Sequence, residues 1–300
     1  MIVYKDGSWQ PLEKTNVSVM DHGFLYGVGL FETFRTYNGV PFLFHDHLSR
    51  LRKGLESVYI DWRESNEHLE ELVTEALKKN EVTEGVIRLN VTAGISNWGL
   101  PIDTYDAPSL LLFTRPVPQM VAESKDAVFL ERRRNTPEGD TRLKSHHYLN
   151  NLLGKRELGA RTDLEGIFLT REGYVAEGLV SNIFWIKGDT LYTPSISTGI
   201  LNGVTRNFIL HLSTLIGLDV KEGAFTPEEL LQGDEVFITN STQEILRVGR
   251  MDAKVFPKRE SSWLSCLKIL YKKSTELQLL SYQQVKKVEV NNGKYELISD

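Results

Sequence analysis

The stretch RLKSHHYLNN, residues 142–151, places one lysine directly before a predicted helix. Lys144 is followed by a serine, two histidines and a tyrosine, and the apolar spacing beyond them predicts a helix over about 147–159. A surface lysine needs no such neighbours, whereas a lysine that does covalent chemistry depends on the groups around it. The residues alone therefore leave two interpretations, a surface lysine at a helix start or a catalytic lysine.

The composition indicates a globular protein with intermixed charges. The 300 residues include 35 Lys or Arg and 40 Asp or Glu, giving a net charge of −5, and 41% of them are hydrophobic. This length suits two ordinary domains. The acidic balance argues against a nucleic-acid-binding protein. The short basic clusters 132–134 and 272–273 are interpreted as solvated faces.

The sequence argues against a disulfide, a metal site, secretion and a membrane span. Its only cysteine, Cys266, excludes an intramolecular disulfide and a cysteine-based metal site. His45 and His47 would share a face if extended, but no third ligand has suitable spacing, so no metal site is predicted. The N-terminal MIVYKDGSWQ has no secretory pattern, and no apolar run reaches the length of a membrane span. We expect a cytoplasmic protein that binds no membrane.

The first part of the chain is predicted to alternate hairpins and helices. Asp6-Gly7 and Asn38-Gly39 are hairpin turn signals, the second within FETFRTYNGVPFLF, residues 31–44. Apolar residues at three- and four-residue steps predict helices over 46–58 and 67–79, the second with Asn66 as N-cap. Strands are expected over 86–92, where Arg88, Asn90 and Thr92 share one face, and over 110–114.

Prolines in PVPQMVAES, residues 116–124, mark a predicted linker between a domain over 1–115 and a domain over 125–300. Thr226-Pro227-Glu228-Glu229 is a typical helix start. Because helices and strands mix without strict alternation, the class is α+β rather than doubly wound. In this part, strands are expected over 127–131, 166–170, 181–187, 189–193 and 235–239, and helices over 204–216 and 261–278. The last residues, after about 280, are expected to form at most an exposed hairpin that turns at Asn291-Asn292-Gly293.

Three further stretches suit binding or catalysis, and each also has a plain structural interpretation. Glu177, expected just before a strand in EGLVSNIFW, is either a loop carboxylate or a partner for a cationic ring nitrogen. The loop in TGILNGVTRNFI, residues 198–209, feeds a helix N-terminus, which suits an anion, although many helices begin this way. Hydroxyls in TNSTQEI, residues 239–245, follow a strand and are often only turn formers.

Together these motifs resemble the class IV, or fold-type IV, pyridoxal-phosphate enzymes. This family includes branched-chain aminotransferases, D-amino-acid aminotransferases and 4-amino-4-deoxychorismate lyases, and the resemblance runs from DHGFLYGVGLFETFR at 21–35 to TNSTQEI. It implies a smaller N-terminal α/β domain and a larger C-terminal domain with a β-barrel-like core. It also implies pyridoxal 5'-phosphate as cofactor, a small-molecule substrate and a homodimer.

The resemblance assigns roles to individual residues. Lys144 matches the lysine that bonds to the cofactor aldehyde and moves protons, and Glu177 matches the carboxylate that faces the ring nitrogen. The other cofactor-binding residues that it implies are Arg50, Tyr148, Val204, Thr205, Ser241 and Thr242. The chain departs from the family pattern at Gly27-Val28-Gly29 and at Asn202, neither of which is expected at the reactive end of the cofactor.

Three stretches look most like bacterial aminodeoxychorismate lyases, namely RRNTPEGDTRLKSHHYLNN at 133–151, RLNVTAGIS at 88–96 and DHGFLYGVGLFETFR at 21–35. Aminotransferases tend to carry Glu-Val-Thr-Pro where this chain has Glu244-Ile245-Leu246-Arg247. The implied reaction yields pyruvate and 4-aminobenzoate, a folate precursor. Its substrate has two carboxylates, for which Arg88 is the leading candidate, followed by His22, Tyr26 and Arg134. The alternatives are a D-amino-acid or branched-chain aminotransferase and a cofactor-binding protein without turnover.

Overall fold

The computed structural model describes residues 1–118, 123–291 and 294–299, and the chain divides into two compact units. Unit 1 comprises residues 1–118, 143–147 and 275–281, and unit 2 comprises the remainder. The Lys144 segment thus belongs to unit 1, although its neighbours on both sides in the chain belong to unit 2. The linker predicted at 116–124 stays a prediction, and residues 119–122 lie outside the described part.

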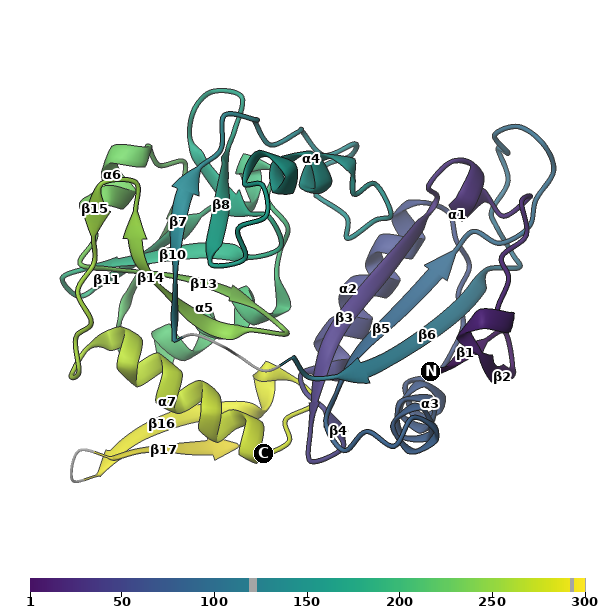
Figure 1. Cartoon of the computed structure of the whole chain (residues 1–300). Coiled ribbons are helices and arrows are strands. Elements are labelled where there is room, and N and C mark those ends of the chain that lie inside the picture. The colour runs from purple at the N-terminus through teal and green to yellow at the C-terminus, as the bar shows by residue number, and fades with distance from the viewer. Residues whose placement is uncertain (119–122, 292–293, 300) are drawn as a thin grey trace. The chain divides into compact units, whose positions relative to one another are not determined.

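Unit 1 is built on a sheet whose described strands follow the order β2-β1-β6-β5-β3-β4 (Figure 1), with every described pair antiparallel. Both predicted hairpins are confirmed, because Asp6, Gly7, Asn38 and Gly39 have the positive φ angles that such turns require. The strands are β1 (Ile2–Lys5), β2 (Ser8–Pro11), β3 (Gly29–Tyr37), β4 (Val40–Pro41), β5 (Gly85–Thr92) and β6 (Ser109–Pro116).

Helices α2 (Phe44–Ser57) and α3 (Asn66–Lys79) cover one face of this sheet, and the short α1 (His22–Leu25) precedes β3. Alternation along the strands directs Leu30 and Phe34 of β3, with Ile87 and Leu89 of β5, into a core with the leucines of both helices. The other face of β3 and β5 carries Phe31 and Arg88. The predicted N-cap of α3 was wrong by one residue, because the Ser65 side chain accepts the His68 N–H.

Unit 2 contains a larger sheet with the order β12-β11-β10-β13-β14-β7-β8-β9 and β15 beside β14. Strand β9 contacts β10 and β11, so the sheet curls into a partial barrel, as the family resemblance implies. Its strands are β7 (Ser124–Phe129), β8 (Leu164–Leu169), β9 (Val175–Gly178), β10 (Asn182–Lys187), β11 (Thr190–Pro194), β12 (Asp219–Gly223), β13 (Glu235–Asn240), β14 (Glu244–Met251) and β15 (Lys254–Val255).

The helices of unit 2 are α4 (Leu149–Glu157), α5 (Val204–Leu215), α6 (Pro227–Leu231) and α7 (Trp263–Glu276), the last two residues of α7 grouping with unit 1. The predicted start of α6 is confirmed, because Thr226 and Glu229 form a reciprocal capping box. The C-terminal residues form a hairpin of β16 (Val285–Asn291) and β17 (Lys294–Ser299) beside α7 (Figure 1). Asn292 and Gly293 of its predicted turn lie outside the described residues.

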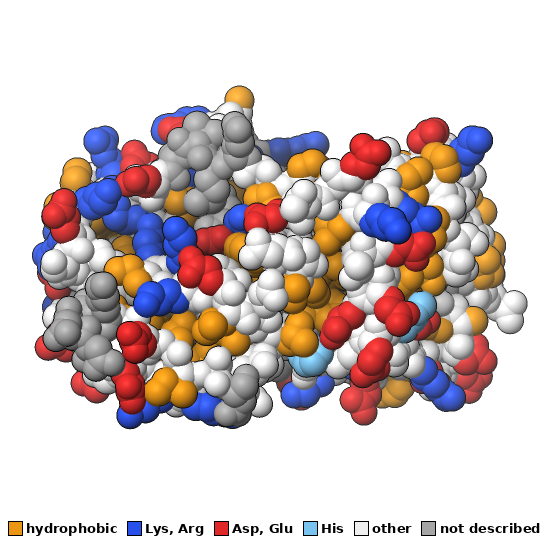
Figure 2. Space-filling view, turned by 90° about the horizontal axis from the view of Figure 1, so that it is seen from below, with side chains coloured by type: hydrophobic (Ala, Val, Ile, Leu, Met, Phe, Trp, Pro, Cys, Tyr) orange, Lys and Arg blue, Asp and Glu red, His pale blue; other side chains and the backbone are white. Residues whose placement is uncertain are grey.

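Charges of both signs are interspersed on the face of the molecule in Figure 2, in keeping with the composition. Among the helices that the structure describes, none is long and apolar enough to cross a membrane.

Lys144 is fixed to β3 by two backbone hydrogen bonds. The Phe31 N–H donates to the Lys144 carbonyl at 2.9 Å, and the His146 N–H donates to the Gly29 carbonyl at 3.0 Å. A Cβ at residue 29 would lie 2.6 Å from His146 Cε1 and 2.9 Å from the Val91 carbonyl oxygen. Glycine is therefore required at residue 29 for this pairing.

We predict that Gly29→Ala destabilises the protein by about 1–3 kcal/mol, because the added methyl group overpacks this contact. Gly139→Ala is the matched control, since a Cβ there meets nothing within 4 Å among the described atoms. Urea unfolding midpoints measure both effects. Equal midpoints for the two variants would contradict the prediction.

Candidate functional site

In unit 1, the amine of Lys144 and the guanidinium of Arg88 both lie near the same aromatic ring. Lys144 Nζ is 4.7 Å from the centre of the Phe31 ring, and Arg88 Cζ is 3.7 Å from the same centre. Arg88 extends from the neighbouring strand and also donates from Nε to the Asn90 side chain at 3.2 Å. The structure therefore brings together two predicted site residues around Phe31, which sequence reasoning did not select.

His146, two residues after Lys144, stacks with Phe31 at a centroid distance of 6.2 Å. Burial, with the positive charge of Arg88, lowers the pKa of the His146 imidazole to about 4, so this ring is neutral near pH 7. Its Nε2 is buried and has no hydrogen-bond partner among the described residues. The positive charge on this face of the sheet therefore comes from the lysine and the arginine rather than from the histidine.

Arg50 is held on the helix-covered face by a buried carboxylate. Its Nε and Nη2 donate to the two oxygens of Glu32 at 2.7 and 2.6 Å, and His47 Nδ1 lies 2.7 Å from Glu32 Oε2. Burial would raise the pKa of Glu32, but Arg50 and then His47 outweigh it and lower that pKa to about 2. Burial lowers the pKa of His47, so a neutral ring donates its N–H to the carboxylate. The phosphate-binding role expected for Arg50 stays a prediction.

His22 and Tyr26 both hold the loop that follows β5. The fully buried His22 has Nδ1 2.9 Å from the Tyr105 hydroxyl and Nε2 3.0 Å from the Asn97 carbonyl, so both ring nitrogens are engaged. The Tyr26 hydroxyl accepts the Gly99 N–H at 3.2 Å. These contacts give the two residues a structural role, and their substrate-binding role stays a prediction.

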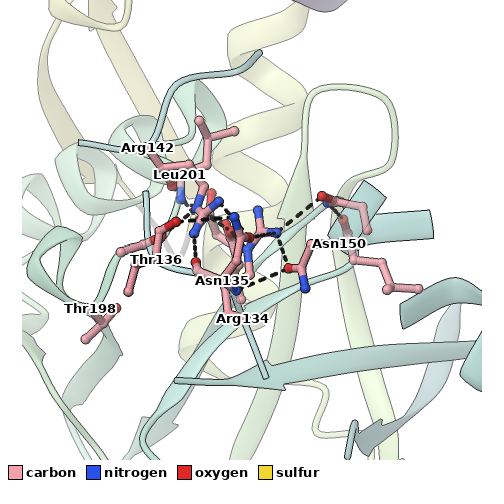
Figure 3. A network of polar contacts seen from close by, with 12 residues as sticks. Arg134, Asn135, Thr136, Arg142, Asn150, Thr198 and Leu201 are labelled. Carbon is pink, nitrogen blue, oxygen red and sulfur yellow. Dashed lines mark hydrogen bonds and ion pairs between the residues drawn. The ribbon is translucent and has the colours of Figure 1, made fainter. Parts of the chain in front are cut away.

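In unit 2, Glu177 precedes strand β10 as expected, but it lies in a further strand, β9, and is 4% exposed. Its Oε1 accepts from Arg134 Nε at 2.7 Å and lies 3.5 Å from Arg142 Nε, while its Oε2 accepts the Leu201 N–H at 2.9 Å (Figure 3). The arginine predicted as a substrate contact is thus bound to the predicted cofactor carboxylate. Interpreting the cluster 132–134 as solvated was wrong for Arg134, which is buried.

The start of α5 in unit 2 suits an anion such as phosphate. Val204 and Thr205 form its first turn, which contains no acidic residue, and within the described residues no side chain caps it. The Thr205 and Ser241 hydroxyls lie 3.3 Å apart beside this turn. A Cβ at residue 203 would clash with the Asn182 side-chain amide, whose nitrogen donates to the Leu201 carbonyl. Glycine therefore lets the loop approach closely, and the donors fit a phosphate group.

The two remaining predicted residues lie at element ends. Tyr148 precedes α4 at its N-cap position and is 39% exposed. Thr242 lies in the turn after β13, where its N–H donates to the Asn240 side chain at 2.9 Å. Their contacts with a cofactor stay predictions.

Glu32, His47, Arg142 and Asn150 belong to these polar clusters but were missed from the sequence. Glu32 had a signal, because strand alternation places it on the same face as Leu30 and Phe34, where a charge needs a partner. His47 and Arg50 are three residues apart on one helix, which directs both towards such a partner. For Arg142 and Asn150 no comparable local pattern exists.

The comparisons with known proteins agree on one family. The family model of amino-transferase class IV matches residues 29–251. An aminodeoxychorismate lyase from Bacillus subtilis is 44% identical, over 91% of this chain and 94% of the relative. A D-alanine aminotransferase from Bacillus licheniformis is 31% identical, over 85% and 89%. The crystal structure of an Escherichia coli branched-chain amino acid aminotransferase superposes with a TM-score of 0.81 at 27% identity, over 91% and 93%.

We predict that Glu32→Gln destabilises the protein by about 3 kcal/mol at pH 7, because a buried ion pair loses one partner. The lowered pKa of Glu32 also means that its stabilisation is present above about pH 4.5 and is lost as the pH falls towards about 2. The variant should lack this part of the acid dependence of unfolding.

Urea unfolding between pH 7 and pH 3 measures both effects. Glu75→Gln is the control, because the exposed Glu75–Lys79 pair contributes only about 0.3–0.5 kcal/mol. If Glu32→Gln unfolds at the wild-type midpoint at pH 7, the carboxylate does not have the assigned role.

Proposed function

The chain belongs to the class IV aminotransferase family and is a pyridoxal-phosphate-dependent enzyme, and on this premise we propose that it is a 4-amino-4-deoxychorismate lyase. The observation that carries the proposal is the guanidinium of Arg88 against the ring that also contacts the Lys144 amine. This substrate has a carboxylate on its ring and another on its enolpyruvyl group. A cation on the ring that also contacts the reactive amine suits such a dianion.

The residues proposed to hold the cofactor are those whose charges and hydrogen-bonding groups suit its phosphate, its phenolic oxygen and its ring nitrogen. We propose that the first turn of α5, with the Thr205 and Ser241 hydroxyls, binds the phosphate, together with Arg50 and Thr242. Tyr148 is proposed to contact the phenolic oxygen, and Glu177 to accept a hydrogen bond from the protonated ring nitrogen. When bound, pyridoxal phosphate supplies an aldehyde for amines and a ring that accepts electrons.

Lys144 performs the proton transfers in this proposal. With the cofactor bound, Lys144 would be the residue that holds its aldehyde, and its free amine would remove the proton from the carbon that bears the substrate nitrogen. The carbon–oxygen bond of the enol ether then breaks, and the departing enolpyruvate takes up a proton to become pyruvate. The ring left behind is aromatic 4-aminobenzoate, so the reaction needs no oxidant and no amino acceptor.

Two further parts of the proposal concern assembly and location. We propose that the enzyme is a homodimer, which the family resemblance supports. We also propose that it is cytoplasmic, which agrees with a single, buried cysteine.

The decisive test is a product assay with purified holoenzyme and aminodeoxychorismate. We predict that 4-aminobenzoate and pyruvate appear in equal amounts and that Lys144→Ala abolishes both. Failure to release these products would refute the lyase. A panel of D- and branched-chain amino acids with 2-oxoglutarate would then test the aminotransferase alternative, for which the similarity to the D-alanine aminotransferase is the support.

Arg88→Ala should raise KM for the lyase substrate about 10- to 100-fold, because a charged hydrogen bond to a carboxylate is lost. The absorption spectrum of the bound cofactor should not change. Arg63→Ala is the control, since Arg63 pairs with Asp61 on the surface and its side chain is 85% exposed. An unchanged KM in Arg88→Ala would remove Arg88 from the substrate site.

A further inference from the structure

The Glu177 carboxylate is enclosed by donors of its own unit. Both oxygens accept hydrogen bonds, Oε1 from Arg134 and Oε2 from the Leu201 N–H, and Arg142 is a second cation at Oε1 (Figure 3). Two positive charges therefore surround one negative charge at a site that is almost fully buried. An enclosure of this kind fixes the orientation of the carboxylate and offsets its charge.

Arg134 is the more tightly held of the two arginines. While Nε donates to Glu177, Nη1 donates to the side-chain oxygens of Asn150 at 2.7 Å and Asn151 at 3.2 Å, both in the first turn of α4. The guanidinium also lies 5.2 Å from the centre of the Phe168 ring. The planar guanidinium of Arg134 has little rotational freedom, because its separate nitrogens bind a residue of β9 and residues of α4. Arg134 therefore links the Glu177 carboxylate to the helix that follows Lys144 in the chain.

Arg142 completes the enclosure but is held mainly by backbone. Its Nε donates to the Gly199 carbonyl at 2.5 Å, and its Nη2 donates to the Asn135 carbonyl. Burial, and then the nearby Arg134, lowers the pKa of Arg142 to about 10, which leaves it charged at neutral pH. The closer contact with Glu177 is therefore the one made by Arg134.

We propose that Arg134 is a positioning residue that acts through Glu177: it fixes this carboxylate and offsets part of its charge, so that the ring nitrogen of the cofactor holds its proton less firmly than it would opposite an unpaired glutamate. The inference rests on the proposed contact between Glu177 and the cofactor. It replaces the substrate-binding role that the sequence suggested for Arg134. It does not depend on which substrate the enzyme uses.

The expected consequence is that the cofactor ring withdraws electrons less strongly than it would opposite an unpaired glutamate. A ring nitrogen that keeps its proton firmly withdraws electrons strongly, which also favours proton return at the cofactor carbon and hence transamination. A lyase needs only enough withdrawal for the enol-ether oxygen to leave, because aromatisation drives the rest. The positive charge of Arg134 beside Glu177 would limit the electron withdrawal to what this elimination needs.

The test is a pH titration of the nitrogen NMR signal of the ring nitrogen, with isotope-labelled cofactor bound to the purified holoenzyme. Arg134→Gln removes one positive charge beside Glu177, so the spectral midpoint should rise by about one pH unit. Glu177→Gln removes the negative charge and should lower it. Arg134→Lys restores a positive charge at the same place and should bring the midpoint back towards the wild-type value.

Arg133→Gln is the matched control, because it removes the same side chain from the exposed neighbouring position. It should leave the midpoint unchanged, which separates the proposal from a general effect of net charge. In Arg134→Gln the Glu177 carboxylate also loses the hydrogen bond that orients it, so kcat should fall about tenfold while KM stays within about twofold. Borohydride reduction and circular dichroism confirm that each variant is folded and loaded.

An unchanged or lowered midpoint in Arg134→Gln would overturn the inference, as would an equal rise in Arg133→Gln. If Arg134→Gln does not fold, the same criteria apply to Arg134→Met, which also removes the positive charge. Failure of the lyase assay leaves the titration unaffected, because it requires no turnover. An unchanged midpoint in Glu177→Gln would instead refute the proposed contact between Glu177 and the cofactor.

Discussion

The short pairing of residues 144–146 with β3 is the constraint on which the rest of the site in unit 1 depends. Two backbone hydrogen bonds place Lys144 opposite Phe31 and His146 opposite Gly29. Because side chains opposite one another lie on the same face of a sheet, the lysine amine faces the side of β3 and β5 that carries Phe31 and Arg88. The opposite side of β3 contributes its leucine and phenylalanine to the core. The two faces of β3 therefore differ, one packing into the core and the other carrying Phe31 beside Lys144 and Arg88.

Each unit contains a buried glutamate that is bound by an arginine. Each of these ion pairs holds both of its side chains in a fixed orientation. Glu32 binds Arg50 through both oxygens, and Glu177 binds Arg134 through one. An unpaired carboxylate at such depth would cost several kcal/mol, so each carboxylate and its arginine constrain each other. In both cases the arginine has a fixed direction, which is what charge-dependent recognition requires.

Much of the fold could be predicted because its signals are local. The hairpin turns at Asp6-Gly7 and Asn38-Gly39 and the capping box of α6 each depend on a few adjacent residues. Strands β9, β12 and β14 were missed for different reasons. Strand β9 has only four residues, and β12 pairs with β11 across helix α5. Strand β14 follows β13 directly, but only the hydroxyl-bearing turn between them was recognised. The burial of Arg134 was also missed. Nothing in three consecutive arginines shows which one turns inward, since that depends on a carboxylate that β9 supplies from much further along the chain.

The stretch in which the chain departs from the aminotransferase pattern, Glu244-Ile245-Leu246-Arg247, lies in β14 between β13 and β7. Ile245 and Leu246 are buried, and Arg247 donates to the Phe256 carbonyl at 2.8 Å and the Ser124 hydroxyl at 3.3 Å. A proline at residue 247 would remove a donor from this central strand, so the departure serves pairing within the sheet. It therefore says little about the substrate. The choice between lyase and aminotransferase rests instead on the face of β3 and β5, where Arg88 and Lys144 contact one ring.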